Sequence, residues 1–316
     1  MRSSPTSPPV APALLDELRA RMSPRRNARA GTRPAIRQGR GGPTSGKRRA
    51  LGQHFLRDEA AAARIVALVS PTARDLVVEI GPGEGALTAH LARAAGRLVA
   101  VEVDAELAAR LTARFAPSGA EILRADALAF DWAALPARRP DPGGRILIVG
   151  NLPYSVGKPI LMALAGAAPA LAAAAPTELA LMLQKEVAER VAAAPGGRTY
   201  GSLSVLSQLV FEVRLAFTVP PGAFRPPPLV DSAVLYLRAL TAPPVPVADP
   251  RRLRAVVRAA FAQRRKSLAN ALAGGLGLPA ERGRAVLAEL NIDPTRRAET
   301  LSLAEFARLA AALETA

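Results

Sequence analysis

The sequence predicts an α/β fold in which helices cover both faces of a mostly parallel sheet, with a small all-helical C-terminal domain after it. Between residues 51 and 240, short β-branched and aliphatic runs alternate with alanine- and leucine-rich stretches of helical length. Such alternation is typical of parallel sheets. Beyond residue 250 the strand-like runs stop, and apolar residues recur at helical spacing instead.

Each element of the sheet has its own short apolar run. We expect parallel strands over residues 76–80, 98–102, 122–124, 146–150 and 179–183, and helices over residues 60–69, 86–95 and 105–115. The runs at residues 210–219 and 233–240 flank a proline-rich loop at residues 220–229. We therefore expect these two strands to form an antiparallel hairpin at the edge of the sheet.

A long apolar stretch over residues 161–183 has the composition of a membrane span. Pro169 and Pro176 interrupt it, Glu178 lies inside it, and alanine partitions only weakly into lipid. We therefore expect a helix, a break and a buried strand. Because the N-terminus lacks the apolar core of a secretory signal, we expect a cytoplasmic protein that does not contact a membrane.

The composition excludes several kinds of site. The chain has 316 residues, no cysteine and two histidines, His54 and His90, so thiolate zinc sites, iron–sulfur clusters and cysteine nucleophiles are excluded and no metal is expected. No Gly-x-Ser-x-Gly sequence points to a serine hydrolase. The formal net charge of +16 favours a polyanionic partner, with nucleic acid before an anionic membrane.

Basic residues gather toward the two ends of the chain. Residues 1–50 hold twelve basic and two acidic residues, so we expect a mostly disordered arm over residues 1–48, with a short helix near residues 12–22. This arm either contacts RNA or is a solvated extension. After a linker at residues 241–250, a helix is expected over residues 251–272, where no acid offsets the arginines. Further helices are expected near residues 286–290 and 303–313.

A glycine-rich turn follows the first expected strand. Residues 77–85 read Val-Val-Glu-Ile-Gly-Pro-Gly-Glu-Gly, and glycines such as Gly81 and Gly83 let a ligand approach the backbone closely. Glu102 ends the next strand, where a carboxylate can bind ribose hydroxyls. A nicotinamide, a flavin, S-adenosylmethionine or a simple tight turn all fit, although Pro82 between the glycines favours S-adenosylmethionine. Asp126 either accepts a hydrogen bond from an adenine amine or caps a helix.

An amide, a proline and an aromatic residue follow the fourth expected strand, in Asn151-Leu152-Pro153-Tyr154. Ligands bind at the carboxyl ends of parallel strands. The Asn151 side-chain oxygen and a nearby main-chain carbonyl can accept both hydrogens of an aromatic amine, which localises its lone pair toward a methyl donor. Tyr154 can stack on the base.

Seven motifs in order carry a resemblance to the ribosomal RNA adenine dimethyltransferase family, from about residue 51 to residue 313. They are Leu51-Gly52-Gln53-His54-Phe55-Leu56, the glycine turn, Asn151-Leu152-Pro153-Tyr154, Leu183-Gln184-Lys185-Glu186-Val187, Tyr200-Gly201-Ser202-Leu203-Ser204, Phe224-Arg225-Pro226-Pro227-Pro228-Leu229-Val230-Asp231-Ser232 and Phe261-Ala262-Gln263-Arg264-Arg265-Lys266. His54 stands where the family often has Asn, and Leu229 where it often has Lys.

The resemblance implies a Rossmann-like class I S-adenosylmethionine-dependent methyltransferase fold over residues 49–242 and a helical RNA-binding domain over residues 243–316. It also implies dimethylation of two adjacent adenosines near the 3′ end of 16S rRNA, with S-adenosylhomocysteine as the product. The implied catalytic residues are Asn151, Leu152, Pro153, Tyr154 and Phe224, and the implied cofactor-binding residues are His54, Leu56, Gly81, Gly83, Glu102, Asp126 and Asn151.

The expected partner is the small ribosomal subunit or its precursor, bound by a monomer. Arg258, Arg264, Arg265 and Lys266 are the candidate RNA-binding residues, since an uncompensated basic helix can position phosphates. Three alternatives stay open: a methyltransferase acting on large-subunit rRNA, a non-catalytic assembly or transcription factor, and a nicotinamide-dependent oxidoreductase.

Overall fold

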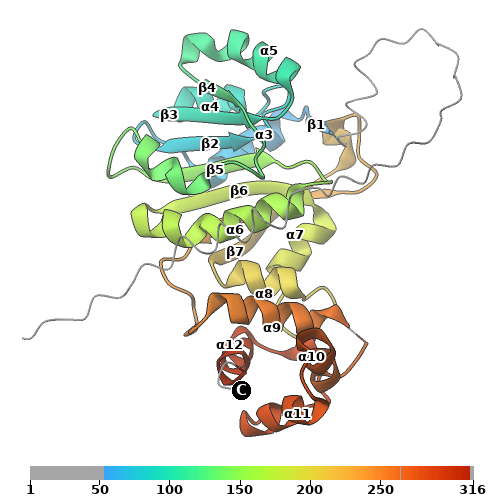
Figure 1. The fold of residues 1–316 in the computed structure, drawn as a ribbon. Coiled ribbons are helices and arrows are strands. Elements are labelled where there is room, and N and C mark those ends of the chain that lie inside the picture. Colours follow the sequence, from blue (N-terminus) through green and yellow to red (C-terminus); the bar gives the residue numbers. More distant parts are fainter. Residues whose placement is uncertain (1–52, 264, 314–316) are drawn as a thin grey trace, which may run out of the picture. The chain divides into compact units, whose positions relative to one another are not determined.

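A seven-stranded sheet forms the centre of the fold in the computed structural model, which describes residues 53–263 and 265–313 (Figure 1). The predicted arm at residues 1–48 and Arg264 lie outside the described residues. The strand order is β4-β3-β2-β5-β6-β9-β7. The strands are β2 (Leu76–Ile80), β3 (Arg97–Glu102), β4 (Glu121–Arg124), β5 (Ile146–Asn151), β6 (Thr177–Gln184), β7 (Phe211–Val219) and β9 (Ser232–Ala239).

The direction of each strand confirms the expected mostly parallel sheet. The pairs among β2, β3, β4, β5 and β6 are parallel, whereas β9 pairs antiparallel with both β6 and β7. The expected hairpin is therefore present at one end of the sheet, with β9 as the reversed strand and β7 at the edge. The chain order reverses direction between β2 and β5, so ligands are expected where these two strands end.

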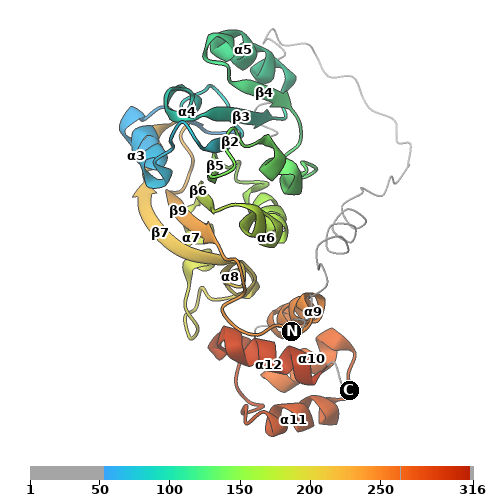
Figure 2. The ribbon, with the colours of Figure 1, turned by 90° about the vertical axis from the view of Figure 1, so that its left-hand side faces the viewer.

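Alternating side chains of the strands pack on two sets of helices. Leu76, Val78 and Ile80 face a core that includes α6 (Gly157–Ala174), while Val77 faces the core of α3 (Glu59–Val69) and α4 (Thr88–Ala94). Figure 2 shows α3 and α6 on opposite sides of the sheet. This period of two places Glu79 on the same side as Val77, which matters for the site below.

By length and composition alone, helix α6 is long and apolar enough to cross a membrane. Its Leu161, Leu164 and Leu171 are at most 2% exposed and belong to the core against the sheet. Helix α6 is thus explained as a core helix, followed by the buried strand β6, as expected. The expectation that Pro169 interrupts the stretch is wrong, because it lies inside α6, at an exposed position.

Four helices after β9 share a second hydrophobic cluster with α8 (Ser202–Gln208). They are α9 (Pro250–Ala262), α10 (Leu268–Leu276), α11 (Ala280–Glu289) and α12 (Leu303–Ala312), shown together in Figure 2. The prediction of one helix over residues 251–272 is wrong. The amides of Leu268 and Ala269 bond to the carbonyls of Arg296 and Pro294, so α10 begins anew there and packs back on α9 at Gly275. The division into domains at residue 242 stays a prediction.

A buried ion pair at the amino end of the sheet gives a pH-dependent contribution to stability. Asp75 is 2% exposed and accepts hydrogen bonds from Arg145 Nη2 at 2.8 Å and from the Thr72 amide at 2.9 Å. Burial alone raises the pKa of this carboxyl, but the hydrogen bonds from Arg145 and Thr72 outweigh burial and lower its pKa to about 2. The stabilisation is therefore complete above the ordinary pKa and is lost as the pH falls toward 2.

We expect Asp75→Asn to destabilise the fold by about 3 kcal/mol at pH 7, because it removes the more buried of the two carboxylates that pair with Arg145 and leaves Glu178 as the other. As the pH falls from 5 toward 2, the difference in melting temperature between the variant and the unmodified protein is expected to narrow. Circular dichroism melts across this range measure it. A constant difference at every pH would contradict the assignment.

Candidate active site

Three glycines with positive φ form the turn after β2. Gly81, Gly83 and Gly85 have φ of 63°, 58° and 86°, a region that side chains with a Cβ rarely adopt. A Cβ on Gly83 would lie 2.8 Å from Cδ1 of Phe55. The missing side chains thus let the 55–56 segment pass directly over the turn and leave its backbone open to a ligand.

Two buried carboxyl groups flank this turn. Glu102, 2% exposed, holds the turn by accepting hydrogen bonds from the amides of Gly83 at 3.2 Å and Asp104 at 2.9 Å. Glu79, 1% exposed in β2, accepts one from Oγ1 of Thr88, the first residue of α4, at 2.6 Å. Burial raises the pKa of Glu102, and it raises the pKa of Glu79 to about 8 despite the Thr88 bond. Glu79 is therefore mostly protonated at neutral pH.

Asn151 ends β5, directly beside the glycine turn. A Cβ on Gly81 would lie 3.9 Å from the Asn151 carbonyl oxygen. The Asn151 side-chain nitrogen donates to the main-chain carbonyl of His54 at 2.9 Å. Since a carbonyl oxygen only accepts hydrogen bonds, this contact fixes which way the amide faces. The side-chain oxygen has no partner among the described residues and is free to accept.

The two residues after Asn151 act through their backbone. The Leu152 side chain is 1% exposed in the core, and its amide bonds to the Met182 carbonyl at 3.0 Å. The Pro153 carbonyl accepts the amides of Val156 and Gly157 at 3.1 and 2.8 Å. Within the described part of the chain, the Leu152 carbonyl has no donor. Of these two carbonyls, it is therefore the one available to a ligand beside the Asn151 oxygen.

An aromatic pair stands over this end of β5. The rings of Tyr154 and His54 have centroids 5.3 Å apart and planes tilted by 37°. The Tyr154 hydroxyl lies 2.6 Å from Ser232 Oγ, and burial raises its pKa. His54 Nδ1 donates to the Pro226 carbonyl at 2.8 Å. His54 thus connects the β5 motif to the proline-rich loop, while its own carbonyl orients Asn151.

The remaining predicted residues lie close by with different exposures. Leu56 and Phe224 pair in the short strands β1 (Phe55–Leu56) and β8 (Phe224–Arg225), and each is 4% exposed in the core. Asp126 is exposed, and its side chain accepts a hydrogen bond from the Leu128 amide at 2.9 Å. The residue before it, Ala125, donates its amide hydrogen to the Glu102 carbonyl, which places Asp126 near the end of β3. Contact of these three side chains with a ligand stays a prediction.

The candidate RNA-binding residues lie after or along α9, away from the β5 motif in the sequence. Arg258, Arg265 and Lys266 are exposed. Arg264 lies outside the described residues, so the structure says nothing of it.

Sequence reasoning missed Val103 and Ser232. Val103 directly follows Glu102 and is 53% exposed, which is unusual for a large apolar side chain in the described part of this chain. Its position beside Glu102 and Asp126 suits a contact with a flat ring. Ser232, fully buried, holds the Tyr154 hydroxyl. The place of Val103, an apolar residue directly after the candidate ribose-binding carboxylate, was a usable signal in the sequence. No local pattern marks the hydrogen bond between Ser232 and Tyr154.

The fold and this site define a Rossmann-like class I S-adenosylmethionine-dependent methyltransferase. Two solved structures share the fold. The 23S rRNA methyltransferase ErmE has a TM-score of 0.60 and 25% identity, with 82% of this chain and 99% of that chain covered. A dimethyladenosine transferase from Plasmodium falciparum has a TM-score of 0.66 and 23% identity, with 81% and 96% covered.

The chain belongs to the ribosomal RNA adenine dimethylase family, whose model matches residues 44–314. A ribosomal RNA small subunit methyltransferase A from Geobacter sulfurreducens is 47% identical over 264 residues, which are 83% of this chain and 93% of that protein. A protein of the same description from Xanthomonas axonopodis pv. citri is 46% identical over 264 residues, with 83% and 95% covered. The predicted family and fold class are confirmed.

Proposed function

We propose that this protein transfers methyl groups from S-adenosylmethionine to the exocyclic amines of two adjacent adenosines near the 3′ end of 16S rRNA, during ribosome biogenesis. The observation that carries the proposal is the fixed amide of Asn151. Its nitrogen is bound by the His54 carbonyl, and its oxygen is free at the strand end next to Gly81.

The residues at the carboxyl ends of β2 and β3 suit S-adenosylmethionine. The positive-φ glycines leave the backbone bare, and the Glu102 oxygens, already oriented by two amides, retain lone pairs for ribose hydroxyls. We assign Val103 to packing against the adenine ring and Asp126 to its amine. His54 and Leu56 belong to the segment that lies over the turn. When bound, the cofactor supplies an electrophilic methyl group on a sulfonium.

Asn151 prepares the target amine for attack. The side-chain oxygen of Asn151 and the carbonyl of Leu152 accept its two hydrogens, which turns the nitrogen lone pair out of the plane of the purine and toward the methyl group. No strong base is needed before transfer, because the methylated amine becomes acidic. Much of the rate enhancement then comes from alignment and proximity. Pro153 fixes the direction of the chain between these two acceptors and Tyr154.

Tyr154 supplies a face for the extruded base, as enzymes that modify bases require. Its hydroxyl is anchored to Ser232 and its ring leans on His54, so the ring has little freedom to rotate away. Stacking of a base on such a ring is worth about 1–3 kcal/mol. We assign Phe224, a buried residue of β8, to the second face of the base.

Small-subunit rRNA is favoured over large-subunit rRNA by the comparisons. The relatives described as small subunit methyltransferases are 46–47% identical and cover nearly their whole length, whereas the 23S rRNA methyltransferase ErmE is 25% identical. We further propose a cytoplasmic monomer that uses S-adenosylmethionine without a metal and binds the small subunit or its precursor.

The decisive experiment is methyl transfer from labelled S-adenosylmethionine to small ribosomal subunits that lack the modification. Mass spectrometry is expected to find dimethyladenosine at two adjacent positions near the 3′ end of 16S rRNA. Large subunits assayed in parallel test the rival substrate, and calorimetry with NAD tests the rival cofactor. Transfer to large subunits alone, or no transfer at all, would overturn the proposal.

Neutralising Arg265 and Lys266 is expected to weaken binding of the small subunit. Each lost phosphate contact lowers the slope of log K against log salt by about 0.7–0.9, so R265Q/K266Q should reduce the slope by one to two units. Filter binding at several salt concentrations measures it. The control R74Q/R93Q removes the same charge near the amino ends of the strands, and an equal loss in the control would refute a specific role.

A further inference from the structure

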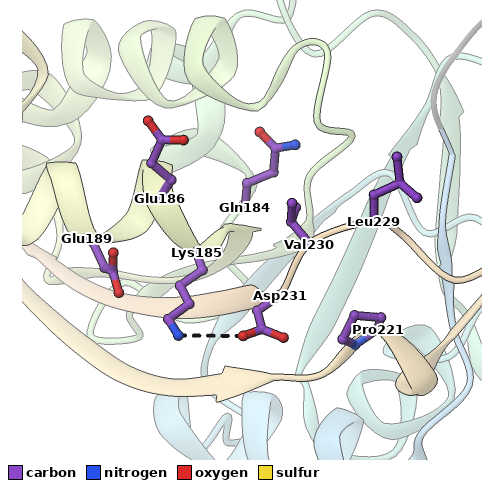
Figure 3. Close-up of a pocket in the computed structure, with 8 residues that line it drawn as sticks. All are labelled: Gln184, Lys185, Glu186, Glu189, Pro221, Leu229, Val230 and Asp231. Atoms are coloured by element: carbon purple, nitrogen blue, oxygen red, sulfur yellow. Dashed lines mark hydrogen bonds and ion pairs between the residues drawn. The ribbon is translucent and has the colours of Figure 1, made fainter.

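A cavity of about 470 Å³ lies beside the candidate active site, between the start of α7 (Lys185–Ala192) and the proline-rich loop. This volume lies within the usual range of small-molecule pockets. The lining residues are Gln184, Lys185, Glu186, Glu189, Pro221, Leu229, Val230 and Asp231 (Figure 3). Neither the cofactor site nor the target-base site described above uses any of these side chains.

The cavity begins one residue away from the target-base site. Asp231 lines it, and the next residue, Ser232, holds the Tyr154 hydroxyl. Two contacts join the cavity wall to this segment: the Lys185 amide bonds to the Asp231 carbonyl at 3.0 Å, and Lys185 Nζ pairs with Asp231 Oδ2 at 3.5 Å. An RNA strand that places one nucleotide at Tyr154 therefore has an adjoining nucleotide within reach of the cavity.

The lining suits a base rather than a phosphate. Leu229 is fully exposed and Val230 is 47% exposed, so together they offer an apolar surface that a flat ring can cover. Figure 3 shows the Gln184 amide standing on the same side as these two residues. A glutamine amide can pair with the ring nitrogen and the exocyclic amine of adenine at once.

The charge of the cavity supports the same choice. Glu186 pairs with Arg190 and Asp231 pairs with Lys185, while Glu189 adds a further carboxylate to the lining. Because the one cation of the lining is already paired, the cavity suits a phosphate poorly, whereas the amine hydrogens of a base find carboxylate acceptors there. The backbone of the RNA must accordingly run along the outside, with the base turned in.

We propose that this cavity holds the base of the second adenosine of the substrate pair while the first occupies the Tyr154 site. The inference rests on the proposed function. Dimethylation removes both hydrogens from the exocyclic amine and adds bulk, so an unmodified neighbour fits the Gln184 amide better than a dimethylated one. The cavity therefore makes transfer to one adenosine depend on the state of the other.

The test compares small subunits reconstituted with 16S rRNA in which either adenosine of the pair is replaced by guanosine. For one of the two replacements, we expect the unmodified protein to methylate the remaining adenosine at least tenfold more slowly than it methylates the same adenosine in the natural pair. Q184L/L229S is expected to reduce this ratio to below threefold. The control L215S changes an equally apolar exposed residue on β7 and should keep the full ratio.

The outcomes separate this inference from the proposed function. If the unmodified protein transfers no methyl group to natural subunits, the proposed function itself fails. If transfer occurs but neither guanosine replacement slows it, or if Q184L/L229S keeps the discrimination, the cavity does not read the neighbouring base. If Q184L/L229S slows methyl transfer to natural and replaced subunits by the same factor, the inference is also overturned. The cavity then binds another ribosomal component, such as a basic protein segment.

Discussion

Asn151→Ala is expected to lower the rate of methyl transfer by about 100-fold or more, the usual cost of removing one preorganised polar group that acts on the reacting atoms. The variant loses the acceptor that turns the amine lone pair toward the methyl group. It also frees the His54 carbonyl, which otherwise binds the Asn151 nitrogen at 2.9 Å. Single-turnover transfer with saturating small subunits measures the chemical step.

Two further variants test whether this loss is specific to the Asn151 amide. Asn270→Ala makes the same side-chain change at an exposed position of α10 and should leave the rate unchanged. Asn151→Asp keeps the size but places an oxygen against the His54 carbonyl, so it should be nearly as inactive as the alanine variant. Calorimetry is expected to show that both Asn151 variants still bind S-adenosylmethionine within about tenfold. Full activity of Asn151→Asp would contradict the role given to the amide orientation.

The elements of the sheet could be predicted because each strand is a short apolar run. Residues 76–80 match β2, and the ends of the other expected strands lie within two residues of those of β3 to β7 and β9. The two-residue strands β1 and β8 carry no such signal. They form only because Phe55 and Leu56 pair with Arg225 and Phe224, which lie far away in the sequence. Local sequence patterns therefore predicted the strands of the sheet but not the 55–56 segment that passes over the glycine turn.

The site divides in the same way. The residue types of Asn151, Tyr154 and Glu102 pointed to their chemistry, since each lies at or just after the carboxyl end of a parallel strand, at the same edge of the sheet. The orientation of Asn151 depends instead on a carbonyl 97 positions earlier in the chain. The break between α9 and α10 likewise depends on carbonyls of the 294–296 loop, while apolar residues at helical spacing run through it. Long-range hydrogen bonds decided both.

Gly83→Ala is the second substitution with a large expected effect. The new Cβ would lie 2.8 Å from Phe55 Cδ1 and 3.0 Å from its Cε1, so the ring must move. Because Phe55 adjoins His54, this movement disturbs the carbonyl that orients Asn151 as well as the turn that faces the cofactor. We expect the dissociation constant of S-adenosylmethionine to rise at least tenfold, about 1.4 kcal/mol, together with a fall in transfer rate.

Gly119 separates the two costs of that substitution. It has a φ of 72°, close to the 58° of Gly83, but a Cβ there would have nothing within 4 Å. Both alanine variants carry the left-handed backbone cost of about 1–2 kcal/mol, so both melting temperatures should fall, and that of Gly83→Ala should fall further because its Cβ also displaces Phe55. Only Gly83→Ala should lose cofactor affinity, because only its Cβ meets Phe55. If calorimetry finds equal affinities of the two variants for S-adenosylmethionine, the glycine turn and the 55–56 segment above it do not form the cofactor site.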